Sequence, residues 1–345
     1  MKSPSIYEKI IKSGLKYKFV WVNNSNIRFE DNNTIKIKRL SPKYYYYLAR
    51  AKYWVNNQNF PTYIKKRPQT IYLQTWHGTP LKKMLYDMKE VHGRSDDYIE
   101  RVGKAIKNWD YLISPSPYAT KAFKSAFRYK NEVLEVGYPR NDIFYKEDRR
   151  KLAQKVRNKL HLKQNKKIIL YAPTFRDNQT LRKNKFYFDI NMDLNLMKES
   201  LGKDYVLLLR MHVVISNQIE IDETLQDFVY NVSDYPDIQE LLLIADILIT
   251  DYSSVMFDFA NTGKPMLFYT YDLENYRDQI RGFYMDLEEE APGPLVNNTN
   301  EIINSIKNID RIKEDYQNKY NAFKQKYCPL DDGFASQRVV DFLFK

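Results

Sequence analysis

Residues 247–254 read ILITDYSS, a short β-forming run that ends at once in a polar turn of aspartate, tyrosine and two serines. The spacing of the residues that follow, 254–261, predicts a short helix. An apolar run of this length, bounded by turn residues, is typical of a fully buried strand. A buried strand followed by a helix is the repeating unit of a parallel α/β sheet.

The same pattern recurs on both sides of this stretch, through the second half of the chain. Because strands and helices alternate, we expect a parallel sheet with helices on both faces. Strands are predicted at 167–172 (KIILYA), 205–210 (YVLLLR), 228–231 and 265–269 (PMLFY). Helices are predicted at 149–162, 238–244 and 335–344, with one or two more within 299–326.

The first half of the chain shows the same alternation. Strands are predicted at 17–22 (YKFVWV), 34–37, 71–74, 111–114 and 134–136, and helices at 42–56 (PKYYYYLARAKYWVN), 98–108 and 117–127. We therefore predict an α/β protein of two doubly wound, Rossmann-type domains with a crevice between them. The domains are residues 1–145 and 146–345, with the last helix packing back toward the first domain.

Composition restricts the class of protein. The 345 residues are 43% hydrophobic and 15% aromatic, which argues against disorder and coiled coil. The single cysteine, Cys328, excludes an internal disulfide and favours a reducing compartment. No apolar run reaches the roughly 18 residues of a membrane span, and residues 1–10 lack the apolar core of a signal peptide. We expect an intracellular, cytoplasmic protein.

The formal charge of +12 is unevenly distributed. Residues 1–150 carry +16 and residues 151–345 carry −4. One interpretation is that many lysines only solvate the surface. The other is that the first domain faces an anionic partner, such as a membrane leaflet, a polyphosphate polymer or a nucleic acid.

Polar side chains gather where the predicted strands end. In open parallel sheets, ligands bind beyond the carboxyl ends of the strands. No strand end carries the glycine motif of a dinucleotide site or a P-loop. Together these ends predict a polar crevice rich in anion-binding groups. They are 75–80 (TWHGTP), 137–142 (GYPRND), 173–177 (PTFRD), 210–212 (RMH) and 251–254 (DYSS).

Two of the four histidines are candidates for chemistry. A histidine after a strand is commonly only a turn residue, but Gly78 and Pro80 predict a tight exposed turn around His77. His212 lies two residues after Arg210, so strand alternation places both on one face. His92 and His161 are interpreted as surface residues.

The segment around Ser253 and Ser254 has two compatible interpretations, a helix cap and an anion site at a helix start. Asp258, one turn later, is either a solvated carboxylate or an acceptor for a ligand hydroxyl. The tyrosine run 44–47 is interpreted as helix–sheet packing in preference to contact with a membrane interface.

In order and spacing, these motifs resemble the CDP-glycerol glycerophosphotransferase family of teichoic acid primases and polymerases. The resemblance runs from about Pro4 to the C-terminus. It rests on 74–82 (QTWHGTPLK), 137–142 (GYPRND), 171–176 (YAPTFR), 210–212 (RMH), 251–254 (DYSS) with Asp258, 281–283 (RGF) and 291–294 (APGP).

The resemblance implies a GT-B-like pair of domains with CDP-glycerol in the cleft, held mainly by the second domain. It implies that His77 and His212 are catalytic. Family members generally have residues ahead of the segment that matches Pro4–Tyr7, so three explanations of the start at Met1 stay open: a first sheet without one edge strand, a natural short form, or a truncated sequence. The implied substrate-binding residues are Trp76, Gly78, Thr79, Pro80, Arg140, Pro173, Thr174, Arg210, Met211, Ser253, Ser254 and Asp258.

The implied reaction is attack by an acceptor hydroxyl on the β-phosphorus of CDP-glycerol, which releases CMP. His77 is the candidate base, because an imidazole titrates near neutrality. His212 and Arg210 would bind the pyrophosphate. No cofactor and no metal are expected, since no carboxylate or histidine cluster suggests one.

The expected partners are a lipid-linked teichoic acid acceptor and the anionic inner face of the cell membrane, with no nucleic acid. Three alternatives stay open: a CDP-ribitol transferase of the same family, a GT-B nucleotide-sugar glycosyltransferase and a non-enzymatic basic membrane-binding module. The sequence distinguishes neither a primase from a polymerase nor one oligomeric state from another.

Overall fold

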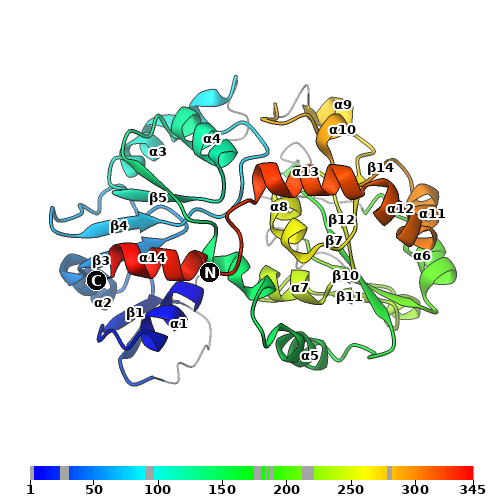
Figure 1. The fold of residues 1–345 in the computed structure, drawn as a ribbon, viewed down its shortest axis with the longest axis horizontal. Helices are drawn as coiled ribbons and strands as arrows, with labels where there is room; N and C mark the ends of the chain where they lie inside the picture. The colour runs from blue at the N-terminus through cyan, green and yellow to red at the C-terminus, as the bar shows by residue number, and fades with distance from the viewer. Residues whose placement is uncertain are drawn as a thin grey trace.

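The computed structural model describes residues 4–23, 31–89, 97–174, 180–182, 185–186, 190–211, 221–277 and 282–344. Its elements form two groups, each built on a parallel sheet, which lie side by side in Figure 1. The predicted α/β class with parallel sheets is therefore confirmed.

The second half is built on a six-stranded parallel sheet. Counted along the chain, its strands lie in the order 3-2-1-4-5-6, so the direction of winding reverses between β7 and β12. Ligands of such sheets bind at the carboxyl ends of the two strands that flank this reversal. The sheet runs β11 (Val229–Asn231), β10 (Tyr205–Leu209), β7 (Lys167–Ala172), β12 (Ile247–Thr250), β13 (Met266–Tyr269) and β14 (Leu295–Val296).

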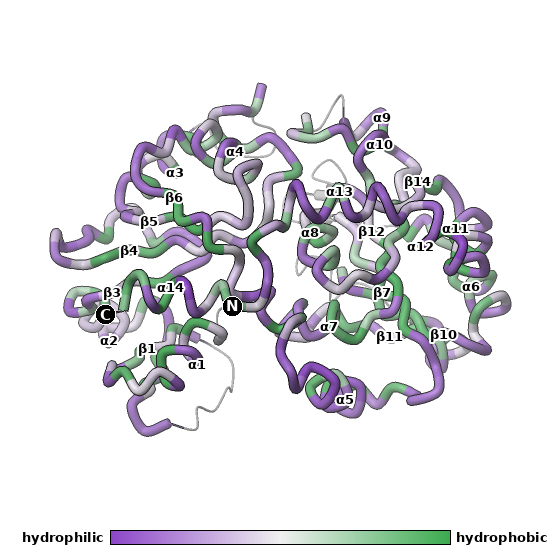
Figure 2. Tube along the Cα trace, in the orientation of Figure 1, coloured by the Kyte–Doolittle hydropathy of each residue, from purple (hydrophilic) through white to green (hydrophobic). Residues whose placement is uncertain are grey.

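Helices cover both faces of this sheet because its strands are apolar on both sides. Along β7, Ile168 and Leu170 enter one core cluster while Ile169 and Tyr171 enter the other. Figure 2 shows hydrophobic residues along β10, whose sequence is YVLLL. One face carries α5 (Arg149–Lys159), α7 (Ile238–Ile244), α8 (Val255–Phe259), α10 (Leu287–Glu290) and α13 (Gln317–Tyr327); the other carries α6 (Leu194–Leu201), α11 (Thr299–Lys307) and α12 (Ile309–Asp315).

The first half is built on a four-stranded parallel sheet whose strands lie in chain order. Right-handed crossovers that all proceed in one direction place their helices on a single face. That face packs on α3 (Tyr98–Ile106) and α4 (Pro117–Phe127). The reversal of a doubly wound sheet, predicted for both halves, is thus absent from the described part of this one. Its strands are β3 (Tyr53–Asn56), β4 (Ile71–Gln74), β5 (Tyr111–Ser114) and β6 (Glu132–Glu135).

The other face of the four-stranded sheet is covered by the two ends of the described chain. Helix α1 (Pro4–Lys12) and helix α14 (Ala335–Leu343) pack together against β4 and β5. Figure 1 shows α14, in red, lying beside α1, in blue, in the half that holds β4. Leu73 and Ile113 of the sheet meet Val339 in this cluster. The division after residue 145 stays a prediction.

One predicted element is wrong. The stretch 42–56 forms two elements, helix α2 (Pro42–Arg50) and strand β3. The side chain of Ser41 accepts a hydrogen bond from the backbone N–H of Tyr44 and caps the helix. At Ala51 the backbone becomes extended, with φ −65° and ψ 134°, and the chain then pairs with β4. Pairing with a neighbouring strand overrides the helical preference of this segment.

Other elements are short or were not predicted. Strand β1 (Phe19–Val22) pairs in parallel with β2 (Thr34–Ile37) in a separate sheet, and β8 (Thr180–Arg182) pairs with β9 (Lys185–Phe186). The stretch 299–326, predicted as one or two helices, forms three, α11 to α13. The remaining pieces are η1 (Leu85–Asp87), η2 (Pro139–Phe144), η4 (Glu223–Leu225), η5 (Ala260–Thr262) and α9 (Leu273–Asn275).

Candidate active site

The reversal of the six-stranded sheet brings two predicted motifs together. The backbone N–H of Thr174, after β7, donates to the carboxylate of Asp251, after β12, over 2.8 Å. The hydroxyl of Thr250 donates to the carbonyl of Ala172 over 2.8 Å. The 173–174 and 251–254 turns are therefore joined where a ligand of such a sheet is expected.

Helix α8 begins directly after this junction. The side chain of Ser254 makes no cap hydrogen bond to the first turn of α8, whereas the Oγ of Ser253 accepts from the N–H of Val255 over 3.4 Å. The helix has five residues, Val255–Phe259, and continues as η5. Any anion binding at this point therefore depends on the two hydroxyls and local N–H groups, with little support from a helix dipole.

The predicted His77 turn follows β4 in the first half. Trp76 adopts a left-handed backbone with φ 51°, which is uncommon for a bulky residue and marks a sharp turn. Its ring packs on Phe127, with 4.8 Å between ring centroids, and the His77 ring lies 4.2 Å from the Trp76 ring. The turn therefore holds an exposed imidazole on an anchored indole.

The imidazole of His77 is oriented by the backbone. Its Nδ1 lies 2.9 Å from the carbonyl oxygen of Asn57. A carbonyl oxygen can only accept a hydrogen bond, so Nδ1 carries a proton in this geometry. In the neutral ring the lone pair is then on Nε2, which is the arrangement that a general base needs.

The two halves touch at predicted residues. A Cβ atom added to Gly78 would lie 2.6 Å from the Oγ of Ser254, so the His77 turn and the start of α8 are in close contact. A small hollow beside this contact joins the His77 turn to the predicted 138–140 motif. It is lined by Asn57, Thr75, Trp76, His77, Tyr138, Pro139 and Arg140. Thr79 and Pro80 are buried behind it.

Two residues predicted to bind substrate are bonded to each other. The Nε and Nη2 atoms of Arg140 donate to the two carboxylate oxygens of Asp258, over 3.0 and 2.9 Å. Only 8% of Arg140 and 7% of Asp258 is exposed. Burial by itself would lower the pKa of Arg140, but Asp258, Tyr138 and Asp331 together raise it. A bidentate pair of this kind fixes the relative position of the segments that carry it.

Two further side chains donate hydrogen bonds to the Asp258 carboxylate. The side-chain amides of Asn141 and Gln239 donate to it over 3.0 and 2.9 Å. The carboxylate therefore accepts four hydrogen bonds from the protein, and a ligand hydroxyl would have to compete with them. Direct substrate contact by Arg140 and Asp258 stays a prediction, while their mutual contact is a property of the fold.

The predicted motif after β10 is only partly described. Arg210 donates through Nη1 to the backbone carbonyls of Val232 and Ser233, and the N–H of the buried Met211 donates to the Oγ of Ser233 over 3.0 Å. Burial lowers the pKa of Arg210, against the opposing effect of Asp234 and Asp237. His212 lies outside the described residues, so its place in the site stays a prediction.

Sequence reasoning did not single out the polar residues that support the site, although Asn141 lies within the predicted 137–142 motif. Asn141, Gln239 and Asn261 are buried, and so is Asp331. All four belong to one hydrogen-bonded cluster with Asp258, although they are far apart in the chain. The signal available for Asp331 was its Pro-Leu-Asp-Asp-Gly turn, at 329–333, between two helical stretches.

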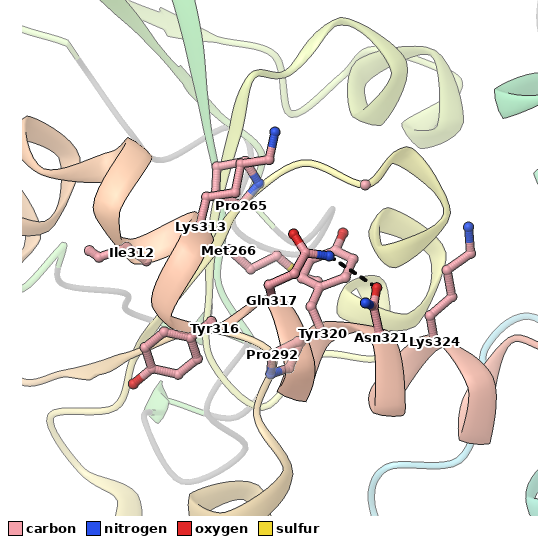
Figure 3. A pocket seen from close by; sticks show the side chains of 11 residues that line it. Pro265, Met266, Pro292, Ile312, Lys313, Tyr316, Gln317, Tyr320, Asn321 and Lys324 are labelled. Carbon is pink, nitrogen blue, oxygen red and sulfur yellow. Dashed lines mark hydrogen bonds between the residues drawn. The ribbon is translucent and has the colours of Figure 1, made fainter.

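A larger hollow lies at the other end of the second sheet. Figure 3 shows it between α12–α13 and the segment that enters β13, where Gln317 donates to Asn321 over 3.1 Å. It is lined by none of the predicted site residues. Over the described ranges, no group of three His, Cys, Asp or Glu side chains is placed to hold a metal ion. None of the helices described is long and apolar enough to cross a membrane.

The sequence matches a known family along its whole length. The CDP-Glycerol:Poly(glycerophosphate) glycerophosphotransferase family matches residues 2–345. The chain belongs to this family. The predicted resemblance is thereby confirmed.

Curated members of the family have similar sequences. The chain is 44% identical, over 337 residues, to a teichoic acid poly(glycerol phosphate) polymerase of Bacillus spizizenii, covering 96% of this chain and 85% of that protein. It is 42% identical to the Bacillus subtilis polymerase of the same name, covering 99% of this chain but only 46% of that protein. The chain thus spans about half the length of one relative and most of the other. Relatives named for ribitol phosphate match at 34% and 30% identity.

A solved structure has the same fold. The wall teichoic acid polymerase TagF superposes with a TM-score of 0.91 at 40% identity, covering 99% of this chain and 84% of that one. The polymerase was also solved as a variant with one histidine replaced by asparagine, after a soak with CDPG.

Proposed function

We propose that the chain transfers glycerol phosphate from CDP-glycerol to a hydroxyl of a lipid-linked poly(glycerophosphate) acceptor, releasing CMP, in wall teichoic acid synthesis. The observation that carries this proposal is the family match over residues 2–345, with relatives named as poly(glycerol phosphate) polymerases. The shared fold of a polymerase soaked with CDPG supports CDP-glycerol as the donor.

The reaction is proposed to take place between the two halves, in a GT-B-like cleft. Two observations support this location: the reversal of the second sheet beside residues 173–174, and the contact of Gly78 with Ser254. The donor would lie against the second half, and the acceptor would approach over the first. His77 would then stand at the boundary between donor and acceptor.

In the proposed step, an acceptor hydroxyl oxygen attacks the β-phosphorus of CDP-glycerol. A new phosphorus–oxygen bond forms, the bond from the β-phosphorus to the CMP oxygen breaks, and the hydroxyl proton passes to Nε2 of His77. Asn57 would hold the His77 ring in the required tautomer through its carbonyl. Arg210 and His212 would bind the pyrophosphate and stabilise the charge that develops on departing CMP.

The similarity to known proteins argues against each of the three alternative functions, on different grounds. Membership of a glycerophosphotransferase family disfavours both a nucleotide-sugar glycosyltransferase and a non-enzymatic module. Relatives named for glycerol phosphate are more similar than those named for ribitol phosphate, which favours CDP-glycerol over CDP-ribitol. No cofactor and no metal are included in the proposal.

The proposal is tested by incubating the chain with a lipid-linked glycerophosphate primer and, in separate reactions, CDP-glycerol, CDP-ribitol or a nucleotide sugar. Mass spectrometry reads the released nucleotide and the length of the lipid product. We expect CMP and an elongated primer only in the reaction that contains CDP-glycerol. Faster turnover of CDP-ribitol would overturn the donor assignment. Release of a nucleoside diphosphate from a nucleotide sugar, with none from CDP-glycerol, would overturn the reaction class.

The surface that we propose for membrane contact includes part of helix α2. The tyrosine run divides in the structure: Tyr44 is buried, whereas Tyr45 and Tyr46 are 40% and 55% exposed. Tyr63 and Leu40 are also exposed large side chains. The hydroxyls of Tyr45 and Tyr63 are hydrogen-bonded over 2.9 Å. We call Leu40, Tyr45, Tyr46 and Tyr63 the tyrosine surface.

Basic residues accompany the tyrosine surface. The guanidinium of Arg50 lies 5.4 Å from the Tyr46 ring, and Lys38, Arg39 and Lys43 are close in sequence. Interfacial tyrosines with neighbouring lysines and arginines suit the headgroup region of an anionic leaflet. We propose that this surface contacts the inner face of the cell membrane, where the lipid-linked acceptor is held, and that the chain acts there from the cytoplasm.

Sedimentation with vesicles tests the membrane proposal. We expect binding to phosphatidylglycerol vesicles that weakens with salt, and little binding to phosphatidylcholine vesicles. The double variant Tyr45→Ser/Tyr46→Ser should bind less, whereas Phe334→Ser, which removes an exposed ring in the other part of the chain, should bind like wild type. Equal loss in both variants would contradict the assignment of this surface.

A further inference from the structure

Two crossing segments of the chain are fastened together between the halves. Gly137 has φ 80°, and a Cβ added to it would lie 2.2 Å from the carbonyl oxygen of Leu330. Arg338 donates to the carbonyls of Val136 and Leu330 over 2.8 and 2.6 Å. The segment that leads into η2 and the segment that leads into α14 are therefore in direct contact.

Asp331 lies at the centre of this contact and is 5% exposed. Its carboxylate accepts from the backbone N–H of Tyr138 over 2.6 Å, from the side-chain amide of Asn141 over 2.6 Å and from that of Asn261 over 3.1 Å. These donors come from the η2 segment and from η5, so one carboxylate joins three separate parts of the chain.

The amide of Asn141 extends the connection to the site. The same Nδ2 that donates to Asp331 also donates to Asp258 over 3.0 Å. Asp258 holds Arg140 and lies on α8, four residues after Ser254. Ser254 in turn meets the His77 turn at Gly78. A continuous chain of contacts therefore leads from Asp331 to both sides of the proposed reaction site.

We propose that Asp331 is a positioning residue: by binding the 138–141 segment and η5 together, it holds the Arg140–Asp258 pair, and with it the Ser254 end of α8, against the His77 turn. Asp331 does not touch the hollow itself. The inference rests on the proposed transferase function, because the geometry that it maintains is the one assigned to catalysis.

The charged and titratable groups around Asp331 supply a readout. It faces Asp258 on α8, Arg140 and Tyr138 in the η2 segment, Tyr145, Cys328 at the end of α13 and Arg338 on α14. Burial raises the pKa of Asp331 to about 6, against the opposing effects of the Tyr138 N–H and Asn141. The ionised Asp331 carboxylate accepts hydrogen bonds from all three donors, and protonation of the carboxylate weakens these hydrogen bonds.

Steady-state kinetics of CMP release by Asp331→Asn tests the inference. We expect kcat at pH 8 to fall roughly tenfold to a hundredfold, with a smaller change in KM for CDP-glycerol. The ratio of wild-type to variant kcat should shrink as the pH falls through about 6. Groups common to both proteins, His77 included, cancel in that ratio. A ratio that is near one, or that does not vary with pH, would overturn the inference.

Asp142→Asn is the matched control. Asp142 is also buried in η2, but its carboxylate accepts from the N–H groups of Ala335 and Ser336 at the start of α14, whereas the amides of Asn141 and Asn261 donate to Asp331. We expect its kcat per folded molecule to match wild type at each pH. An equal loss of kcat in both variants would show that Asp331 is only a structural residue.

A second variant, Asn141→Ser, distinguishes loss of the bridge from misfolding. A second method, hydrogen exchange, tests the inference even if the transferase assignment fails. Asn141→Ser removes the bridge, so its effect on kcat and that of Asp331→Asn should not add in the double variant. Hydrogen exchange needs no substrate: Asp331→Asn should speed exchange at 138–141 and at 255–259, and Asp142→Asn should not do so at 255–259. Unchanged exchange at 255–259 would overturn the inference even if the wild-type chain released no CMP.

Discussion

Gly78 and Ser254 meet across the two halves of the molecule, so closely that a methyl group on Gly78 would have to displace the Ser254 hydroxyl. The contact joins the turn that carries His77 to the turn that starts α8. It makes the spacing between these turns a property that a single substitution can change.

Gly78→Ala should therefore separate the two turns. The added Cβ would lie 2.6 Å from the Oγ and 3.2 Å from the Cβ of Ser254. We expect kcat/KM for CDP-glycerol to fall roughly tenfold or more, since an ångström of misplacement at reacting groups is costly. The double variant Gly78→Ala/Ser254→Ala should recover part of the loss if the hydroxyl is the main obstacle.

Gly103→Ala is the control for this effect. A Cβ at Gly103 would also lie 2.6 Å from a hydroxyl, that of Tyr86, but on helix α3. We expect activity close to wild type. If Gly103→Ala reduced kcat/KM as much as Gly78→Ala does, the contact with Ser254 would have no special role.

Breaking the Arg140–Asp258 pair should destabilise the fold. Arg140→Met leaves the Asp258 carboxylate buried without its cation, so we expect the free energy of unfolding in urea to fall by about 3–5 kcal/mol. Lys104→Ala, which removes an exposed pair with Glu100, should cause no measurable loss. A loss from Arg140→Met no greater than from Lys104→Ala would mean that the buried pair does not hold the two segments.

Cys328 should be inert in the folded chain. It is 2% exposed and its Sγ donates to the carbonyl of Phe257 over 3.2 Å. Burial raises the pKa of the thiol well above its usual value, so little thiolate forms at neutral pH. An aromatic disulfide reagent should release no chromophore from the native protein and one equivalent in urea. Rapid reaction in the native state would contradict the packing of α13 against α8.

The stability of the fold should depend on Asp331 in a defined pH range. Its pKa is raised by burial to about 6, so the folded chain holds the proton more tightly than the unfolded chain does. The stability linked to this group is therefore present at low pH and is lost as the pH rises from about 4 through about 6. Relative to wild type, Asp331→Asn should gain up to about 3 kcal/mol in unfolding free energy between pH 4 and pH 7. A difference that stays constant across this range would contradict a raised pKa.

The strand-and-turn pattern was enough to predict most of the second half. Stretches such as 167–172 and 247–254 are apolar on both faces and end in polar turns, so local sequence alone indicates buried parallel strands and the edge at which a site forms. The predicted turns at 173–174 and 251–254 do lie together, joined by the Thr174–Asp251 hydrogen bond.

What local pattern could not supply is pairing over long distances. Residues 53–56 were predicted as part of a helix, because only their pairing with β4 makes them strand β3. Asp258 looked like a ligand group, and its bond to Arg140, 118 residues earlier, appears only in the folded chain. The turn at 329–333 marks Asp331 as a turn residue but gives no sign of its three donors, which come from the η2 segment and η5.

The most direct test of the central claim is CMP release from CDP-glycerol by His77→Ala, with His161→Ala as the control. His161 is exposed at the end of α5 and makes no part of the proposed site. We expect His77→Ala to keep its fold by circular dichroism and to lose ~10²–10⁴-fold in kcat, while His161→Ala turns over like wild type. Wild-type turnover by His77→Ala would contradict the assignment of this imidazole as the base.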